Sequence, residues 1–181
     1  MNTTLEFSGR ILASGDDDGR VLIWDLRSRK PAFRFADGSP HNDIIMNFAL
    51  REDKATLVSC SGDGTVSAID LRKGKVLAQS DNQETALLSV ALVRGGSKVV
   101  VGTQDGPLHM FSWGRFADMD DRLVGHEGSV DCMLPADGKG KGTGPGAGLL
   151  FTGGEDGLVR LVGVYPHRMV KVVGEHGDEP V

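Results

Sequence analysis

The sequence predicts an all-β protein built from four repeats, each with four short antiparallel strands. Four of the six Asp-Gly pairs in the 181-residue chain recur at intervals of 45, 42 and 51 residues. An apolar run precedes each pair and alternating apolar residues follow it, whereas no stretch shows the 3.6-residue period of a helix. The four pairs begin at Asp18, Asp63, Asp105 and Asp156.

Each Asp-Gly pair predicts a tight hairpin turn between two strands. Glycine accepts positive φ without a steric penalty, and aspartate can accept hydrogen bonds from the turn backbone. In the first repeat, "DDDG" (Asp16–Gly19), we therefore expect Asp18 to be the hydrogen-bonded turn residue and Asp16 and Asp17 to be solvated. A calcium loop would need acidic residues at alternating positions and a final glutamate, which this stretch lacks.

The repeats divide the chain into units and leave one glycine-rich insert, which accounts for part of the 26 glycines. A phosphate-binding loop would need Gly-Lys followed by Ser or Thr at the start of a helix, whereas here a strand pattern follows. We therefore interpret the insert as a flexible surface loop. The predicted units are residues 3–35, 41–80, 86–123 and 126–173, with the start of another at 174–181 and the insert at 138–148.

Composition limits the classes of partner. Lys and Arg number 20 against 25 Asp and Glu, a net charge of −5, so no nucleic-acid-binding surface is expected. No apolar run approaches the roughly 18 residues that a membrane span needs, and we expect no membrane partner. Cys60 and Cys132 lie far apart in apolar segments, which predicts buried thiols in a reducing compartment.

No catalytic constellation is visible, so we predict no enzyme, no cofactor, no metal ligand and no small-molecule substrate. The sequence contains neither H-E-x-x-H nor G-x-S-x-G. Cys132 near His126 is the best hydrolase-like pair, but the stretch "VDCML" around the cysteine is typical of a core strand.

The repeat length, the four strands per unit and Trp24-Asp25 resemble the blade of a WD40 β-propeller. The resemblance implies a buried network that links a histidine, a serine or threonine, the turn aspartate and a tryptophan. No unit carries all four residues, so we expect packing of apolar strand faces to supply most of the stability. The network positions are Ser14, Asp18 and Trp24 in the first unit; His41, Ser59 and Asp63 in the second; Asp105 in the third; and His126, Thr152 and Asp156 in the fourth. Ile69 and Val162 stand where the second and fourth units would carry tryptophan.

Three longer stretches resemble the WD repeat-containing protein 55 family and its fungal relatives. They cover Ser89–Phe116, Ser129–Pro135 and Val173–Val181, and the likeness extends over nearly the whole chain. The resemblance implies a non-enzymatic scaffold that acts through protein partners, among them ribosome-assembly factors. It also implies a role in rRNA processing and ribosome biogenesis, with location in the nucleus and nucleolus and the cytoplasm as a second site.

Members of that family have about seven blades, and this sequence supplies about four. We therefore expect the sequence to be part of a longer propeller, with a small four-bladed ring as the alternative. An open ring leaves apolar blade faces uncovered, so we expect the chain on its own to self-associate, aggregate or bind a chaperone.

Two other functions are compatible with the sequence. Trp24, Asp25 and Arg27 resemble the box through which some WD proteins dock on the adaptor of cullin-four ubiquitin ligases, and Ile69–Arg72 is a weaker copy. This pattern suggests a substrate receptor, although an exposed strand end is the favoured explanation. An enzyme or small-molecule binder that uses a propeller channel is the third possibility, and only the permissiveness of the fold supports it.

Overall fold

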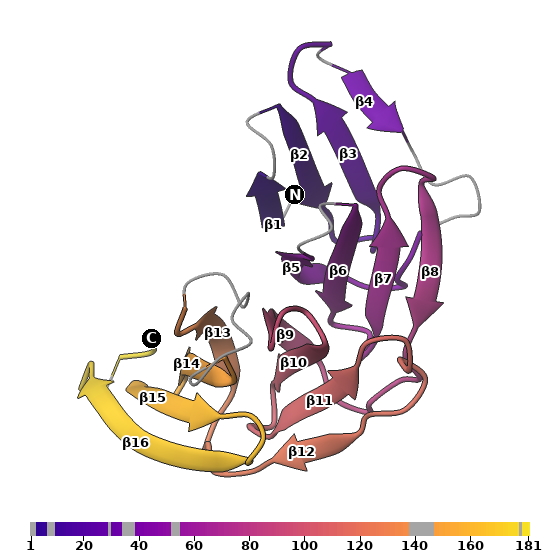
Figure 1. Ribbon diagram of the computed structural model, residues 1–181. Coiled ribbons are helices and arrows are strands. Elements are labelled where there is room, and N and C mark those ends of the chain that lie inside the picture. Colours follow the sequence, from indigo (N-terminus) through magenta and orange to yellow (C-terminus); the bar gives the residue numbers. More distant parts are fainter. Residues whose placement is uncertain are drawn as a thin grey trace. The chain divides into compact units, whose positions relative to one another are not determined.

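The computed structural model describes residues 3–6, 10–28, 30–33, 39–51, 55–137, 147–177 and 179–181. Sixteen strands form four antiparallel sheets of four strands each, and the described residues contain no helix (Figure 1). The all-β prediction is confirmed. Most of the predicted glycine-rich loop, residues 138–146, lies outside the described residues.

The chain divides into two compact units, Met1–Leu87 and Leu88–Val181, and each contains two sheets. Within every sheet the strands follow one another in chain order, as in a meander. The sheets of the first unit are β1 (Thr3–Glu6), β2 (Ile11–Gly15), β3 (Val21–Asp25) and β4 (Lys30–Phe33), then β5 (Ile45–Leu50), β6 (Thr56–Ser61), β7 (Val66–Asp70) and β8 (Lys75–Gln79).

The second unit repeats this arrangement. Its β9 begins at the last residue of the first unit, so the boundary between the units falls at the start of that strand. Its sheets are β9 (Leu87–Val93), β10 (Lys98–Thr103), β11 (Leu108–Ser112) and β12 (Asp121–Leu123), then β13 (Val130–Pro135), β14 (Leu149–Gly154), β15 (Leu158–Gly163) and β16 (Arg168–Glu175).

The core of the first unit lies between its two sheets. Alternation along a strand sends every second side chain to the same face, and that face is apolar here. Ala13 and Ile23 from the first sheet pack with Ile45, Leu57 and Ile69 from the second, and all five are at most 2% exposed. Ile69, which replaces a tryptophan of the WD40 pattern, is therefore a fully buried core residue.

The second unit has an equivalent core between its own pair of sheets. Leu108 and Met110 of β11 pack in one cluster with Val130, Leu150 and Val162 of the last sheet. Val162, the other residue at a tryptophan position, is fully buried. Burying a valine or isoleucine side chain contributes about 1.5–3 kcal/mol, so apolar packing compensates for the missing tryptophans.

The four Asp-Gly pairs occupy the same turn, the one between the second and third strands of each sheet. The backbone register repeats as well, since Gly15 pairs with Val21 in the first sheet as Cys60 pairs with Val66 in the second. All four turn glycines have positive φ: 75° at Gly19, 79° at Gly64, 104° at Gly106 and 70° at Gly157.

Each of these glycines also lies directly on the backbone of a segment that follows its own sheet. A Cβ atom added at any of the four would come within 3 Å of a carbonyl oxygen in that segment. The turns therefore need glycine for two reasons, its φ angle and its lack of a side chain. Measured from the added Cβ atom, the carbonyl oxygen lies at 2.3 Å for Gly19 (His41 O), 2.9 Å for Gly64 (Thr85 O), 2.7 Å for Gly106 (His126 O) and 2.6 Å for Gly157 (Gly177 O).

The two requirements can be separated by comparing Gly19→Ala with Gly114→Ala. Gly114 has φ of 84°, but nothing lies within 4 Å of an added Cβ. We expect Gly114→Ala to cost about 1 kcal/mol of unfolding free energy from backbone strain alone. Gly19→Ala should cost about 3 kcal/mol, because the turn must also move away from His41 O. Urea denaturation of both variants measures the difference, and equal losses would contradict the close packing of this turn.

Candidate functional site

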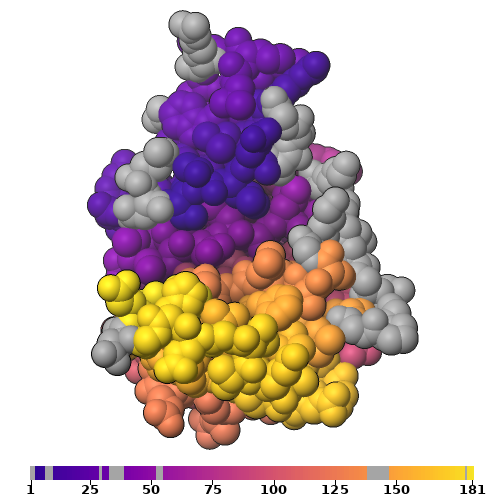
Figure 2. Space-filling view, turned by 90° about the vertical axis from the view of Figure 1, so that its left-hand side faces the viewer, coloured from indigo at the N-terminus to yellow at the C-terminus, as the bar shows by residue number. Residues whose placement is uncertain are grey.

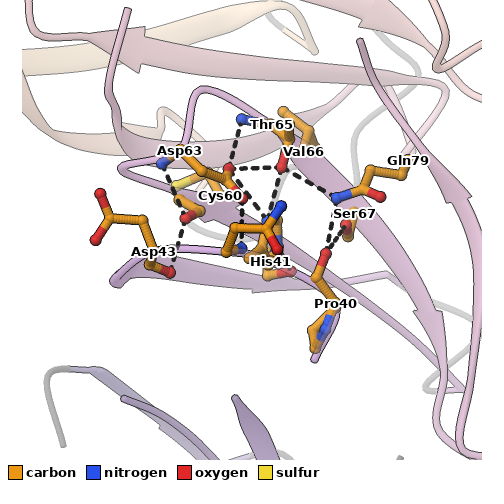
Figure 3. Close-up of polar contacts among 12 residues, drawn as sticks. Pro40, His41, Asp43, Cys60, Asp63, Thr65, Val66, Ser67 and Gln79 are labelled. Atoms are coloured by element: carbon orange, nitrogen blue, oxygen red, sulfur yellow. Dashed lines mark hydrogen bonds and ion pairs between the residues drawn. The ribbon is translucent and has the colours of Figure 1, made fainter. Parts of the chain in front are cut away.

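The most extensive polar network of the described residues surrounds His41, next to the β6–β7 turn (Figure 3). His41 is 2% exposed. Its Nε2 lies 2.7 Å from Ser59 Oγ of β6, and its Nδ1 lies 2.8 Å from Thr65 Oγ1 just after the turn. Both ring nitrogens are therefore hydrogen-bonded, as a buried imidazole requires.

Asp63, the turn aspartate, lies on the other side of Thr65. Its Oδ1 accepts hydrogen bonds from Thr65 Oγ1 at 2.6 Å and Thr65 N at 2.9 Å, and Oδ2 accepts one from Asn42 N at 2.8 Å. The distance from Asp63 Oδ1 to His41 Nδ1 is 3.5 Å. Burial alone would raise the pKa of Asp63, but the interactions with His41, Thr65 and Asn42 outweigh it and hold the pKa well below its usual range.

Further bonds fix the segment that carries His41. Pro40 O accepts hydrogen bonds from Gln79 Nε2 at 2.7 Å and from Ser67 Oγ at 3.3 Å (Figure 3). Asp43 O accepts one from Ser61 Oγ at 3.0 Å. The network thus clamps the residues that lead into β5 onto strands β6, β7 and β8 of the same sheet. The structure brings His41, Ser59 and Asp63 together and adds Thr65 to the network. Sequence reasoning missed Thr65, although its position two residues after the turn aspartate could have indicated it.

The fourth sheet has a reduced version of the network. His126 Nε2 lies 2.9 Å from Thr152 Oγ1, but its Nδ1 is buried without a partner among the described residues. Leu158 stands where the second sheet has Thr65, so no hydroxyl is available there. Burial, together with the charge of Arg160, lowers the pKa of His126 from 6.5 to about 4.

Asp156 takes a different partner from that of Asp63. It accepts a hydrogen bond from Leu158 N at 3.1 Å and pairs with Arg160, whose Nη1 lies 2.6 Å from Asp156 Oδ2. Arg160 is 6% exposed, which makes the pair a buried one. Burial raises the pKa of Asp156, but Leu158 N and Arg160 stabilise the carboxylate more and lower it overall. Sequence reasoning missed Arg160, although its place four residues after Asp156 was visible.

The first sheet departs from the prediction for its three aspartates. Ser14 Oγ does accept a hydrogen bond from Trp24 Nε1, at 2.8 Å. Asp18, however, is exposed and forms an ion pair with Arg20. Asp16 is the residue whose Oδ1 accepts the turn bonds, from Asp18 N at 3.1 Å and Arg20 N at 2.9 Å. The two-residue offset arises because Asp16 occupies the position of Ser61, which bonds Asp63 N in the second sheet.

Asp105 of the third sheet is exposed, and its turn is closed in another way. In the second and fourth sheets the turn aspartate accepts the N–H of the residue two positions later. Here that residue is Pro107, which has no N–H to donate. Thr103 Oγ1 instead donates a hydrogen bond to Pro107 O at 2.7 Å.

The Trp24-Asp25-x-Arg27 pattern forms a tight turn after β3. Arg27 donates to Asp25 through Nε at 2.9 Å and Nη2 at 2.6 Å, and Asp25 Oδ1 also accepts Arg27 N at 3.0 Å. The hydrogen bonds from Arg27 lower the pKa of Asp25 to about 2. Asp70 Oδ1 likewise accepts the backbone N–H groups of Arg72 and Lys73. Asp25 and Asp70 therefore shape equivalent turns in two different sheets. Because this structural role accounts for the pattern, an adaptor-docking role is not favoured.

The cysteine prediction is half correct. Cys60 is buried, but Cys132 is exposed on β13, where it donates weak bonds to Gly153 O and Val181 O. Partial burial raises the pKa of Cys132, and the thiol form is a poor nucleophile. His126 is bonded to Thr152, so the hydrolase-like pair is not assembled. The described residues contain no group of three or more His, Cys, Asp or Glu side chains placed to hold a metal ion.

Residues 3–25, which span β1 to β3, match the family model described as WD domain, G-beta repeat. The chain is 40% identical over 182 residues to WD repeat-containing protein 55 of Arabidopsis thaliana, which covers all of this chain. The chain is a WD-repeat protein that resembles WD repeat-containing protein 55.

Relatives in other organisms give the same result. The chain is 34% identical to WD repeat-containing protein 55 of Homo sapiens over its whole length. It is 41% identical to WD repeat-containing protein JIP5 of Coprinopsis cinerea, and the match covers 94% of this chain. It spans about half of these curated relatives, with 48%, 44% and 42% of the plant, human and fungal proteins covered. Among the described residues, no helix is long and apolar enough to cross a membrane.

The His41 network predicts a large effect of a single substitution. His41→Leu would leave Ser59 and Thr65 without their imidazole partner in a buried site. We expect a loss of about 2–4 kcal/mol in unfolding free energy, measured by urea denaturation. His176→Leu, at an exposed position, is the control and should change stability by less than about 0.5 kcal/mol. Equal effects of the two substitutions would contradict a stabilising role for the network.

The lowered pKa of His126 predicts that the stability of the folded chain depends on pH. Its folded pKa of about 4 lies below the ordinary 6.5, so the unfolded chain binds more protons between these values. Stability from the neutral ring is complete above pH 6.5 and is lost as the pH falls toward 4. Urea unfolding at pH 7 and pH 5 gives the change in unfolding free energy between the two pH values. We expect this change to be about 1 kcal/mol smaller in His126→Gln than in the unsubstituted chain, after allowance for partial solvent screening. The same difference in both proteins would contradict the assignment to His126.

Proposed function

We propose that this protein is a non-enzymatic WD-repeat scaffold that holds protein partners in rRNA processing and ribosome biogenesis, in the nucleus and nucleolus. The observation that carries the proposal is the similarity to WD repeat-containing protein 55 over the whole chain, at 34–40% identity in animal and plant relatives. WD-repeat proteins generally mediate protein–protein interaction, and the ribosomal role is the one that the family resemblance implies.

The chemistry of the polar residues supports a scaffold. His41 and Asp63 bond to neighbouring side chains and to the backbone of Asn42, so both hold one strand-entry segment in place. Asp156 serves the β14–β15 turn and a buried arginine. The residues that would be natural acids, bases or ligands are thus engaged in positioning the chain, which favours binding over catalysis.

The charge balance favours proteins as partners. The net charge of −5 gives no excess of cations to neutralise the phosphates of RNA. A role in rRNA processing would then be exerted through assembly factors that contact RNA themselves. A scaffold of this kind needs exposed surface on strands and turns, which all four sheets provide.

Affinity capture tests the proposal. The tagged chain, expressed in nuclei of a eukaryotic cell, should enrich ribosome-assembly factors relative to a tagged WD-repeat protein of unrelated function. Depletion of the endogenous protein should cause unprocessed pre-rRNA to accumulate on a northern blot. Capture without assembly factors, together with an unchanged pre-rRNA pattern, would overturn the ribosomal role. In that case the WD-repeat assignment would stand, because it depends on the fold and the sequence comparison.

A further inference from the structure

The four sheets end in outer strands that differ in how well they resist pairing with another strand. β4, β8, β12 and β16 contain 4, 5, 3 and 8 residues. β4 contains Pro31, which cannot donate a hydrogen bond, and β12 is very short and begins with Asp121 and Arg122. A proline, short length, charged side chains and β-bulges are the usual protections of a sheet edge; β16 has two bulges and Lys171, but it has no proline and it is not short.

β16 is the longest of these outer strands and has no proline. It lies at the end of its sheet, next to β15 (Figure 1). In Figure 2 the yellow atoms of the C-terminal residues, which include β16, lie on the face toward the viewer. The far edge of the strand therefore offers a row of backbone groups to a further strand.

Valine side chains make the middle of this edge partly apolar. Two β-bulges in the pairing with β15 leave Val170 and Val173 outside the register of paired residues. Val170 is 38% exposed, Val172 is 53% exposed and Val173 is 48% exposed. Three partly exposed valines within four residues on a sheet edge leave apolar surface that a further strand would cover.

We propose that β16 pairs with β16 of a second copy of this chain, as antiparallel strands about a two-fold axis between Lys171 and Val172. That register places Arg168 of each copy opposite Glu175 of the other, because the two residues lie equally far from the axis. It also places Val170 opposite Val173. Opposite charges and apolar pairs directly across two strands are the contacts that stabilise antiparallel sheets.

The sequence of β16 is self-complementary, and this favours a second copy over another partner. A two-fold interface uses the same surface on both molecules, so each contact occurs twice. Arg168 and Glu175 meet this requirement at the two ends of the strand, and both are exposed. Near the axis, the aliphatic stem of Lys171 would cover Val172 while its ammonium group stays in water.

Charge reversal in two separate variants tests the pairing. Arg168→Glu alone would place Glu opposite Glu at both ends, and Glu175→Arg alone would place Arg opposite Arg. In a heterodimer of the two variants, both end pairs join Glu to Arg. We expect each variant alone to weaken dimerisation about tenfold or more in sedimentation equilibrium, and an equimolar mixture to restore it.

The controls change the same charges elsewhere in the chain. Lys75→Glu on the outer strand β8 and Glu179→Arg beyond β16 lie at exposed positions and should leave dimerisation unchanged. The inference is overturned if the 181-residue chain is a monomer at every concentration, or if both reversals leave association intact. A mixture that does not recover is also a negative result, since it would indicate that β16 binds a different segment. None of these outcomes bears on the proposed ribosomal role.

Discussion

Close contact between a turn and the segment that follows its sheet is the constraint on which the repeat depends. At all four Asp-Gly turns the glycine lies against a backbone carbonyl, with no room for a Cβ atom. The contact fixes where the chain must go after it leaves the outer strand of a sheet. This lack of room explains why Asp-Gly is present at this turn in all four sheets, whereas Trp-Asp is present in one.

The polar side chains around these turns are alternative ways of meeting one requirement, which is to bond a buried turn backbone. The second sheet uses His41, Asp63 and Thr65, whereas the fourth uses Asp156 with the buried Arg160. The third replaces the aspartate bond by one from Thr103. Because each solution bonds the turn, no sheet needs all four residues of the WD40 pattern, and the apolar core of each unit contributes the remaining stability.

The fold was predictable from the sequence because its signals are local. Asp-Gly between alternating runs specifies a hairpin within about ten residues, and four copies specify four similar sheets. The networks were less predictable because their partners lie 18 to 24 residues apart in sequence, as His41 does from Ser59 and Thr65. A shift of two positions also exchanges roles between neighbours, which is how Asp16 came to accept the bonds expected of Asp18. Cys132 looked like a core residue, but β13 exposes three of its six side chains.

The outer edges of the sheets carry unpaired backbone groups, whereas several charged turn residues already bond within the chain. Arg27 illustrates the point, since its guanidinium is held by Asp25 although the side chain is 64% exposed. An edge that carries a proline or only three residues cannot extend the sheet far, and β4 and β12 are of this type. β16 combines eight residues, exposed valines and opposite charges at its two ends. Such a strand gains most from pairing when the partner presents the same sequence in the opposite direction, because Arg168 and Glu175 at the two ends then meet their opposites and the valines lose contact with water together.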